Sequence, residues 1–98
     1  MEIIKNLDGN KLTIALEGRL DTSTAPNLEA ELKSSLNDVT ELILDFNKLE
    51  YISSAGLRVV LAAQKTMSKQ GSMKLVGVND EVMEVFEITG FVDILTIE

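Results

Sequence analysis

Two adjacent serines, Ser53 and Ser54, carry the side chains of this sequence best placed for chemistry. They follow an apolar run at residues 42–46 and precede Ala55, Gly56 and a stretch with apolar residues at helical spacing. This pattern predicts that the two serines open a helix directly behind a strand. The first turn of a helix leaves backbone N–H groups unpaired and carries the positive end of the helix dipole, so it can hold a phosphate. The stretch therefore indicates a regulatory phosphorylation site.

A serine at a helix start is often only an N-cap, whose hydroxyl accepts a hydrogen bond from a backbone amide. A cap needs one hydroxyl, and the sequence offers two. The second is left at an exposed helix end, beside the small residues Ala55 and Gly56 that let a kinase approach closely. From the residues alone, Ser53, Ser54 or neither could be the acceptor.

Catalytic chemistry finds little support in the composition. The chain has no histidine and no cysteine, so a serine nucleophile would lack the base that activates it, and thiolate chemistry is excluded. Carboxylates such as Asp21 and Asp45 could bind magnesium through oxygen, but Asp21 is explained more simply as a loop-shaping residue. We expect neither an enzyme nor a bound cofactor or metal.

Length and charge bound the remaining functions. With 98 residues the chain predicts one domain, residues 1–98, with an aliphatic core. Sixteen acidic against nine basic residues give a net charge of −7, which disfavours direct binding of nucleic acid. No apolar run approaches the roughly 18 residues that span a bilayer, and the N-terminus lacks a signal-peptide layout. We therefore expect a cytoplasmic protein without membrane insertion.

Hydrophobic periodicity predicts eight elements in the order ββαβαβαβ. They are a hairpin of residues 1–7 and 11–17, a helix from capping residues 21–24 to about residue 36, a strand at 41–46, a helix from the serines to a left-handed cap at Gly71, a strand at 73–78, a short helix between Asn79 and Gly90, and a strand at 92–97. Residues 47–52 read as the longest loop. Because crossovers are right-handed, the later strands should lie parallel with helices packed on the sheet.

Four segments together resemble the anti-sigma factor antagonist family, whose members share the STAS fold. They are Ser53-Ser54-Ala55-Gly56-Leu57, Gly18-Arg19-Leu20-Asp21, Asp45-Phe46-Asn47-Lys48-Leu49 and Phe86-Glu87-Ile88-Thr89-Gly90-Phe91. Their order and separation cover nearly the whole chain. Two positions depart from the family pattern, since Ser53 stands where the family usually has Asp and Ala55 where it has Ser or Thr.

The resemblance implies an α/β fold: one STAS domain with a mixed, mostly parallel sheet and helices packed mainly on one face. It implies a binding switch rather than an enzyme. The unphosphorylated form would bind a serine-kinase anti-sigma factor, an ATP-binding protein similar to histidine-kinase ATPase domains, and free the sigma factor. Phosphorylation at Ser54 would end binding, and a PP2C-type phosphatase would restore it.

The resemblance also places the partner-binding surface around the acceptor, at Asp21, Thr22, Ser53, Ala55, Gly56 and Arg58. Arg58 would fall in the first helical turn, where a cation opposes the dipole. An alternative is a STAS interaction subunit of a lipid-transport ATP-binding cassette complex, in which the serine would be structural. A receiver-like or nucleotide-binding domain is disfavoured, because the chain lacks a glycine-rich phosphate loop and an acidic cluster at the first strand.

Overall fold

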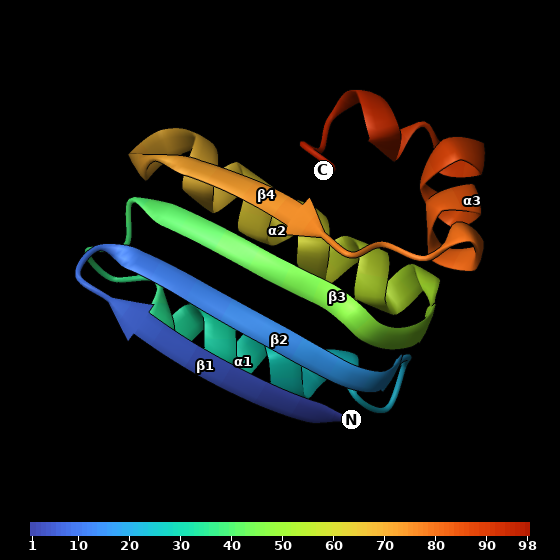
Figure 1. Cartoon of the computed structure of the whole chain (residues 1–98), viewed down its shortest axis with the longest axis horizontal. Helices are drawn as coiled ribbons and strands as arrows, with labels where there is room; N and C mark the ends of the chain where they lie inside the picture. The colour runs from blue at the N-terminus through green and yellow to red at the C-terminus, as the bar shows by residue number, and fades with distance from the viewer.

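The computed structural model describes all residues, 1–98, and contains one mixed four-stranded sheet in the order β1-β2-β3-β4 (Figure 1). The antiparallel hairpin β1 (Glu2–Asp8) and β2 (Lys11–Leu20) turns at Gly9, where φ is +61°. Strands β3 (Glu41–Ile52) and β4 (Ser72–Val76) continue the sheet in parallel. The predicted α/β fold with a mixed, mostly parallel sheet is confirmed.

Helices α1 (Ala25–Ser35) and α2 (Ser54–Gln70) lie side by side against one face of the sheet (Figure 1). Both belong to crossovers between parallel neighbours, and crossovers of one hand place their helices on the same face. Helix α3 (Asp80–Thr89) and the short 3-10 helix η1 (Phe91–Asp93) follow β4 at one end of the molecule. The predicted packing of helices mainly on one face is thus confirmed.

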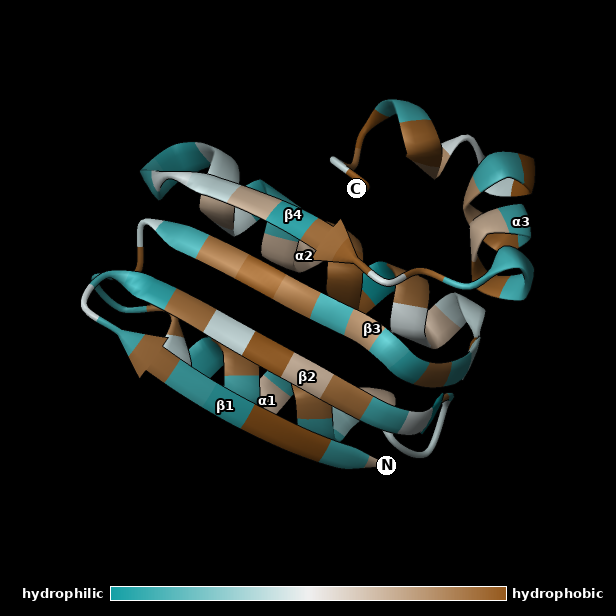
Figure 2. Cartoon of the chain, viewed as in Figure 1, coloured by the Kyte–Doolittle hydropathy of each residue, from teal (hydrophilic) through white to brown (hydrophobic).

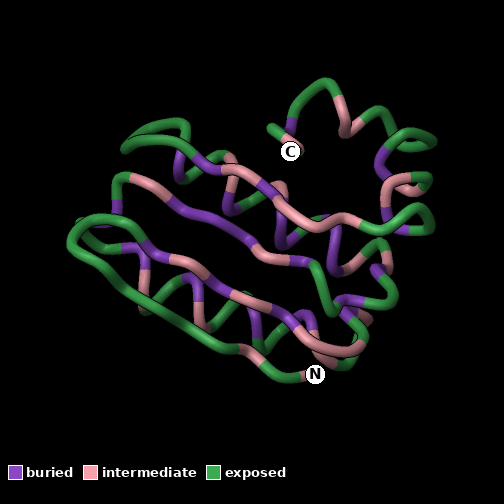
Figure 3. Tube along the Cα trace, in the orientation of Figure 1, coloured by how far each residue is buried: buried purple, intermediate pink, exposed green.

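The core lies between the sheet and the two long helices. Hydrophobic residues run along β2 and β3 (Figure 2), and buried positions gather in those two strands while β1 is exposed over almost its whole length (Figure 3). The leucines predicted as the buried stripe of α1, Leu28, Leu32 and Leu36, are at most 7% exposed. No charged or polar side chain is buried with them. The aliphatic core expected from the composition is therefore present.

Strand β3 is twice as long as the strand predicted at residues 41–46. The prediction of a loop at residues 47–52 was therefore wrong. Strand β3 continues to Ile52 because β2 also extends, to Leu20, and pairs with it in parallel through two register shifts. The extension brings Arg19 opposite Tyr51. Its residues are mostly exposed and polar, so only the pairing with β2 identifies them as strand.

The strand predicted at residues 92–97 is also absent as an element. After Gly90 the chain turns through η1, where the amides of Ile94 and Leu95 both donate to the Phe91 carbonyl oxygen. Only Ile97 then reaches the sheet edge, in a single parallel bridge to Leu75. Because the 3-10 helix takes up residues 91–93, too few residues remain after it to form a strand.

Asparagine starts α3 and glycines end α2 and α3, as predicted, except for the backbone conformation at Gly71. Asn79 caps α3 by accepting the Val82 amide at 2.8 Å, and Gly90 ends that helix at φ +78°. Gly71 does end α2, but its backbone is extended at φ 173°, not left-handed. Close packing explains the glycine there, because a Cβ would lie 1.9 Å from the Thr40 carbonyl oxygen.

Candidate functional site

The two serines at the start of α2 have different environments. Ser53 is the N-cap, with extended backbone at φ −97° and ψ 175°, and its hydroxyl oxygen accepts the Gly56 amide at 3.3 Å. Its own amide donates to the Leu20 carbonyl oxygen at 2.9 Å, which ties the helix start to the end of β2. Ser54 is the first helical residue and is exposed. The capping function therefore falls to Ser53 and leaves the Ser54 hydroxyl accessible.

The start of α2 is electrostatically suited to an anion. The helix has 17 residues and no acidic side chain in its first turn, so nothing in the helix neutralises the positive end of its dipole. Its first amides lack intrahelical acceptors, and the Ser53 hydroxyl satisfies only that of Gly56. A phosphate on Ser54 would stand at this end of the helix.

Gly56 is buried and permits the close approach of α2 to the sheet. A Cβ at this position would lie 2.7 Å from Leu20 Cγ and 3.0 Å from Ile52 Cγ1. Gly56, expected among the partner-binding residues, is thus covered by the chain's own core. Gly56 therefore sets how closely the start of α2, with Ser53 and Ser54, approaches the sheet.

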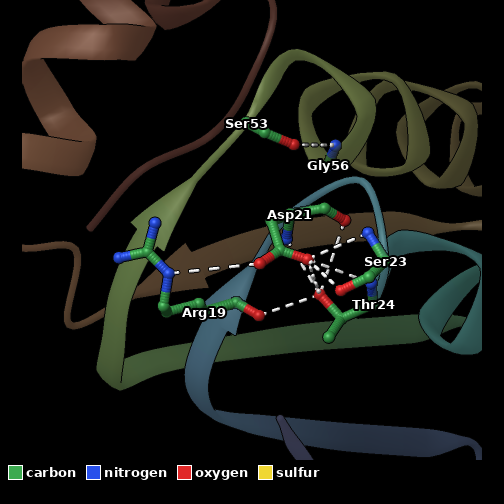
Figure 4. A network of polar contacts seen from close by, with 6 residues as sticks. All are labelled: Arg19, Asp21, Ser23, Thr24, Ser53 and Gly56. Atoms are coloured by element: carbon green, nitrogen blue, oxygen red, sulfur yellow. Dashed lines mark hydrogen bonds and ion pairs between the residues drawn. The ribbon is translucent and has the colours of Figure 1, made fainter.

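Asp21 organises the loop between β2 and α1 (Figure 4). Its Oδ1 accepts the Ser23 hydroxyl at 2.7 Å, the Ser23 amide at 3.0 Å and the Thr24 amide at 3.2 Å. These bonds, led by the Ser23 hydroxyl and only partly opposed by desolvation, hold the pKa of Asp21 below its ordinary value. The Thr24 hydroxyl, predicted to help cap the helix, instead donates to the Arg19 carbonyl oxygen at 2.8 Å. The loop-shaping role predicted for Asp21 is confirmed.

Arg19 and Tyr51 form a stacked pair beside this loop. The guanidinium carbon lies 4.2 Å from the centre of the Tyr51 ring. Arg19 Nε lies 4.0 Å from Asp21 Oδ2, the ion pair that Figure 4 draws. Neither residue was among the predicted site residues. The sequence places them 32 positions apart, and they meet only because the extended part of β3 pairs with β2.

Three predicted site residues, Thr22, Ala55 and Arg58, line one open hollow of about 300 Å³ between the starts of α1 and α2. Ala25, Pro26, Glu29 and Val59 complete its wall. Arg58 is the fifth residue of α2, so the expected opposition to the dipole in the first turn was wrong. It lies four residues after Ser54, on the same side of the helix.

The structure does not bring carboxylates together into a metal site. Asp45 accepts the amide and the side-chain amide of Asn47 with its Oδ1, at 2.9 and 2.7 Å. No group of three or more potential ligands gathers anywhere in the structure. Nor does any helix combine the length and apolar character required to cross a bilayer.

The model of the STAS domain family matches residues 2–98. A Bordetella bronchiseptica protein named as an anti-sigma factor antagonist, BtrV, is 41% identical over 93% of this chain and 79% of its own length. The anti-sigma-B factor antagonist of Listeria monocytogenes is 32% identical over 97% of this chain and 85% of its own length.

Solved structures share the fold. The anti-sigma factor antagonist SpoIIAA in its unphosphorylated form superposes with a TM-score of 0.78 at 19% identity, over 99% of this chain and 87% of its own. Its phosphorylated form gives a TM-score of 0.77 at 20% identity, over 99% of this chain and 91% of its own.

Proposed function

This chain belongs to the STAS domain family, and we propose that it is an anti-sigma factor antagonist that binds a serine-kinase anti-sigma factor and so frees a sigma factor. The relatives named as anti-sigma factor antagonists support this reading. We place the switch at Ser54: unphosphorylated, the chain binds, and phosphorylated, it does not. In this scheme the chain is a binding module of the cytoplasm and not an enzyme.

The observation that carries the proposal is the exposed hydroxyl of Ser54 on the first residue of α2, with the cap already supplied by Ser53. A purely structural serine would be the one that caps. This division of roles supports the switch over the alternative of a standing subunit of a lipid-transport complex, where the serine has only a structural task.

Phosphorylation changes the surface more than the fold. It adds about −1.5 to −2 charges at a position where helix amides and dipole tolerate an anion. The guanidinium of Arg58, one helical turn away, can offset part of that charge. A partner fitted to a neutral hydroxyl would instead have to desolvate a dianion, at a cost of several kcal/mol.

The contact surface that we propose surrounds Ser54 and contains Asp21, Thr22, Ser53, Ala55 and Arg58. Thr22, Ala55 and Arg58 share one hollow, and the ordered loop of Asp21 forms its neighbouring rim. Gly56 acts beneath this surface. The kinase would be an ATP-binding protein with a histidine-kinase-like fold, and a PP2C-type phosphatase would remove the phosphate.

Phosphopeptide mapping tests the proposal. The chain is incubated with ATP and an anti-sigma factor kinase from the same organism, and the modified peptide is sequenced, with Ser54→Ala as the matched control. We expect phosphate on Ser54 in the unsubstituted chain and none in the variant. Phosphate only on Ser53 or within residues 22–24 would overturn the assignment. Failure of the unmodified chain to bind that kinase would overturn the function.

A further inference from the structure

We propose that Arg19 and Tyr51 form a specificity contact that binds a carboxylate of the anti-sigma factor and thereby selects which kinase engages Ser54. The inference rests on the proposed function and adds to it a residue pair and a partner chemistry. We call this pair the Arg19–Tyr51 contact.

The pair is accessible and already arranged. The Arg19 side chain is 60% exposed and Tyr51 is 39% exposed. Ring stacking at 4.2 Å limits the rotation of the guanidinium, and Nε lies at ion-pair distance, 4.0 Å, from Asp21 Oδ2. The two other guanidinium nitrogens point away from Asp21 (Figure 4). The two terminal nitrogens thus remain available to a partner.

The shape of the guanidinium group indicates which ligand it would bind. A planar guanidinium presents parallel N–H donors that match a carboxylate in a bidentate pair, which a lysine ammonium cannot reproduce. Because stacking already limits the rotamers of Arg19, less conformational entropy is lost on binding. Arginine and tyrosine are also the residue types enriched among side chains that dominate interface affinity.

Location links the pair to the switch. Tyr51 lies three residues before Ser54, and Arg19 lies two residues before Asp21. The chain has only two arginines, and the second, Arg58, lies four residues after Ser54 and lines the hollow between the starts of α1 and α2. Both therefore lie near the start of α2, in a chain whose net charge is −7. An acidic partner surface would meet these cations here.

Calorimetric titration of the purified anti-sigma factor kinase tests the inference. Arg19→Ala should bind about tenfold more weakly or worse, and Arg19→Lys should not restore affinity, because the fork is lost. Tyr51→Leu should weaken binding less. Since the ring acts by holding Arg19, the double variant should lose about as much as Arg19→Ala alone. Lys33→Ala, an exposed cation in the last turn of α1, is the control and should bind like the unmodified chain.

Three results would overturn the inference: near-normal affinity of Arg19→Ala, full rescue by Arg19→Lys, or losses that simply add in the double variant. A loss seen only when the kinase holds nucleotide would also overturn it, because the anion would then be a phosphate. Circular dichroism melts of each variant identify any that misfolds, in which case Arg19→Lys, which keeps the charge, decides. Should the unmodified chain bind while Arg19→Ala binds equally, this inference fails and the proposed function stands. Should the unmodified chain not bind, both fail.

Discussion

Ser53 and Ser54 are chemically identical neighbours, and the helix start gives them separate tasks. Ser53 lies just before the first turn with extended backbone, the conformation in which a hydroxyl can accept an amide of the turn. Ser54 has already entered the helix, and its hydroxyl remains exposed. The absence of the acidic residue that the family usually has at position 53 does not remove the cap, because a serine hydroxyl supplies the same acceptor without its charge.

Ser53→Ala should destabilise the fold while Ser54→Ala should not. Loss of an N-cap hydroxyl costs about 1 kcal/mol, whereas an exposed substitution at the first helical position stays within about 0.5 kcal/mol. Urea unfolding of both variants measures the difference. Equal losses would show that the two hydroxyls share the cap.

Ser54→Asp should keep the fold and lose the partner. A carboxylate in the first turn stabilises a helix by about 0.3–1 kcal/mol, so the melting temperature should stay or rise slightly. Affinity for the anti-sigma factor should fall about tenfold or more, while Ser54→Ala retains it. Thermal melts and calorimetry report the two effects. A Ser54→Asp variant that binds like the unmodified chain would contradict the switch.

Asp21 should make stability depend on acid pH. Its folded pKa is lowered from the ordinary value of 3.8 by hydrogen bonds led by the Ser23 hydroxyl. A lowered folded pKa means that the carboxylate contributes stability above the unfolded pKa and that this contribution is lost as pH falls through the folded pKa. The difference in unfolding free energy between the unmodified chain and Asp21→Asn should be constant above about pH 5 and shrink below about pH 4. Urea unfolding across this range measures it, and a difference that grows in acid would refute the sign.

At the scale of elements, the site depends on where β2 and β3 end and how closely α2 follows. The last residues of β3 pair with the last residues of β2, and Ser53 continues this link through its amide bond to the Leu20 carbonyl oxygen. Gly56 then lets the first turn of α2 settle onto Leu20 and Ile52. The orientation of Ser54 is therefore set by packing beneath it.

Gly56→Ala should disturb this element contact. A Cβ would come within 2.7 Å of Leu20 Cγ, and overpacking of this kind costs about 1–3 kcal/mol, against which the better helix propensity of alanine returns at most about 1 kcal/mol. We expect lower stability together with weaker binding of the anti-sigma factor, because the helix start must shift. Denaturant unfolding and calorimetry check both quantities. Unchanged stability would mean that the turn can move without loss.

At the scale of the whole molecule, packing and charge are unevenly distributed. The central strands β2 and β3 carry the core, while β1 is exposed at one edge and η1 has no buried residue. Six of the sixteen acidic residues and none of the nine basic ones follow Val76. Residues 1–76 are thus close to neutral, with ten acidic and nine basic side chains.

Hydrogen exchange should follow this gradient. Amides of β2 and β3 inside the sheet should exchange only through global unfolding, whereas those of β1 and residues 91–98 should exchange through local opening, because few buried contacts hold them. Exchange followed by NMR or mass spectrometry gives the order. Protection of β1 equal to that of β3 would contradict it.

The sequence by itself determined the aliphatic core, the order of seven of the eight predicted elements and the helix start at the serines. These follow from periodicity, capping residues and glycines, which act over a few neighbouring positions. Asn79 and Gly90 illustrate this. The Asn79 side chain caps the start of α3, and Gly90 ends that helix in the left-handed conformation that glycine adopts easily. The candidate acceptor and the loop role of Asp21 were likewise predicted from the chain itself and its resemblance to a family.

Only the tertiary structure decided the length of β3, the fate of the C-terminal residues and the stacking of Arg19 on Tyr51. Most of residues 47–52 are polar and exposed, with Leu49 and Ile52 buried, and they form a strand because β2, some 30 positions away, supplies the hydrogen-bonding partners. Gly71 likewise caps its own helix through its amide bond to the Met67 carbonyl oxygen, but the need for glycine there comes from the Thr40 backbone, which leaves no room for a Cβ. Strand pairing and backbone packing join residues far apart in the chain, so no local pattern could encode where these contacts form.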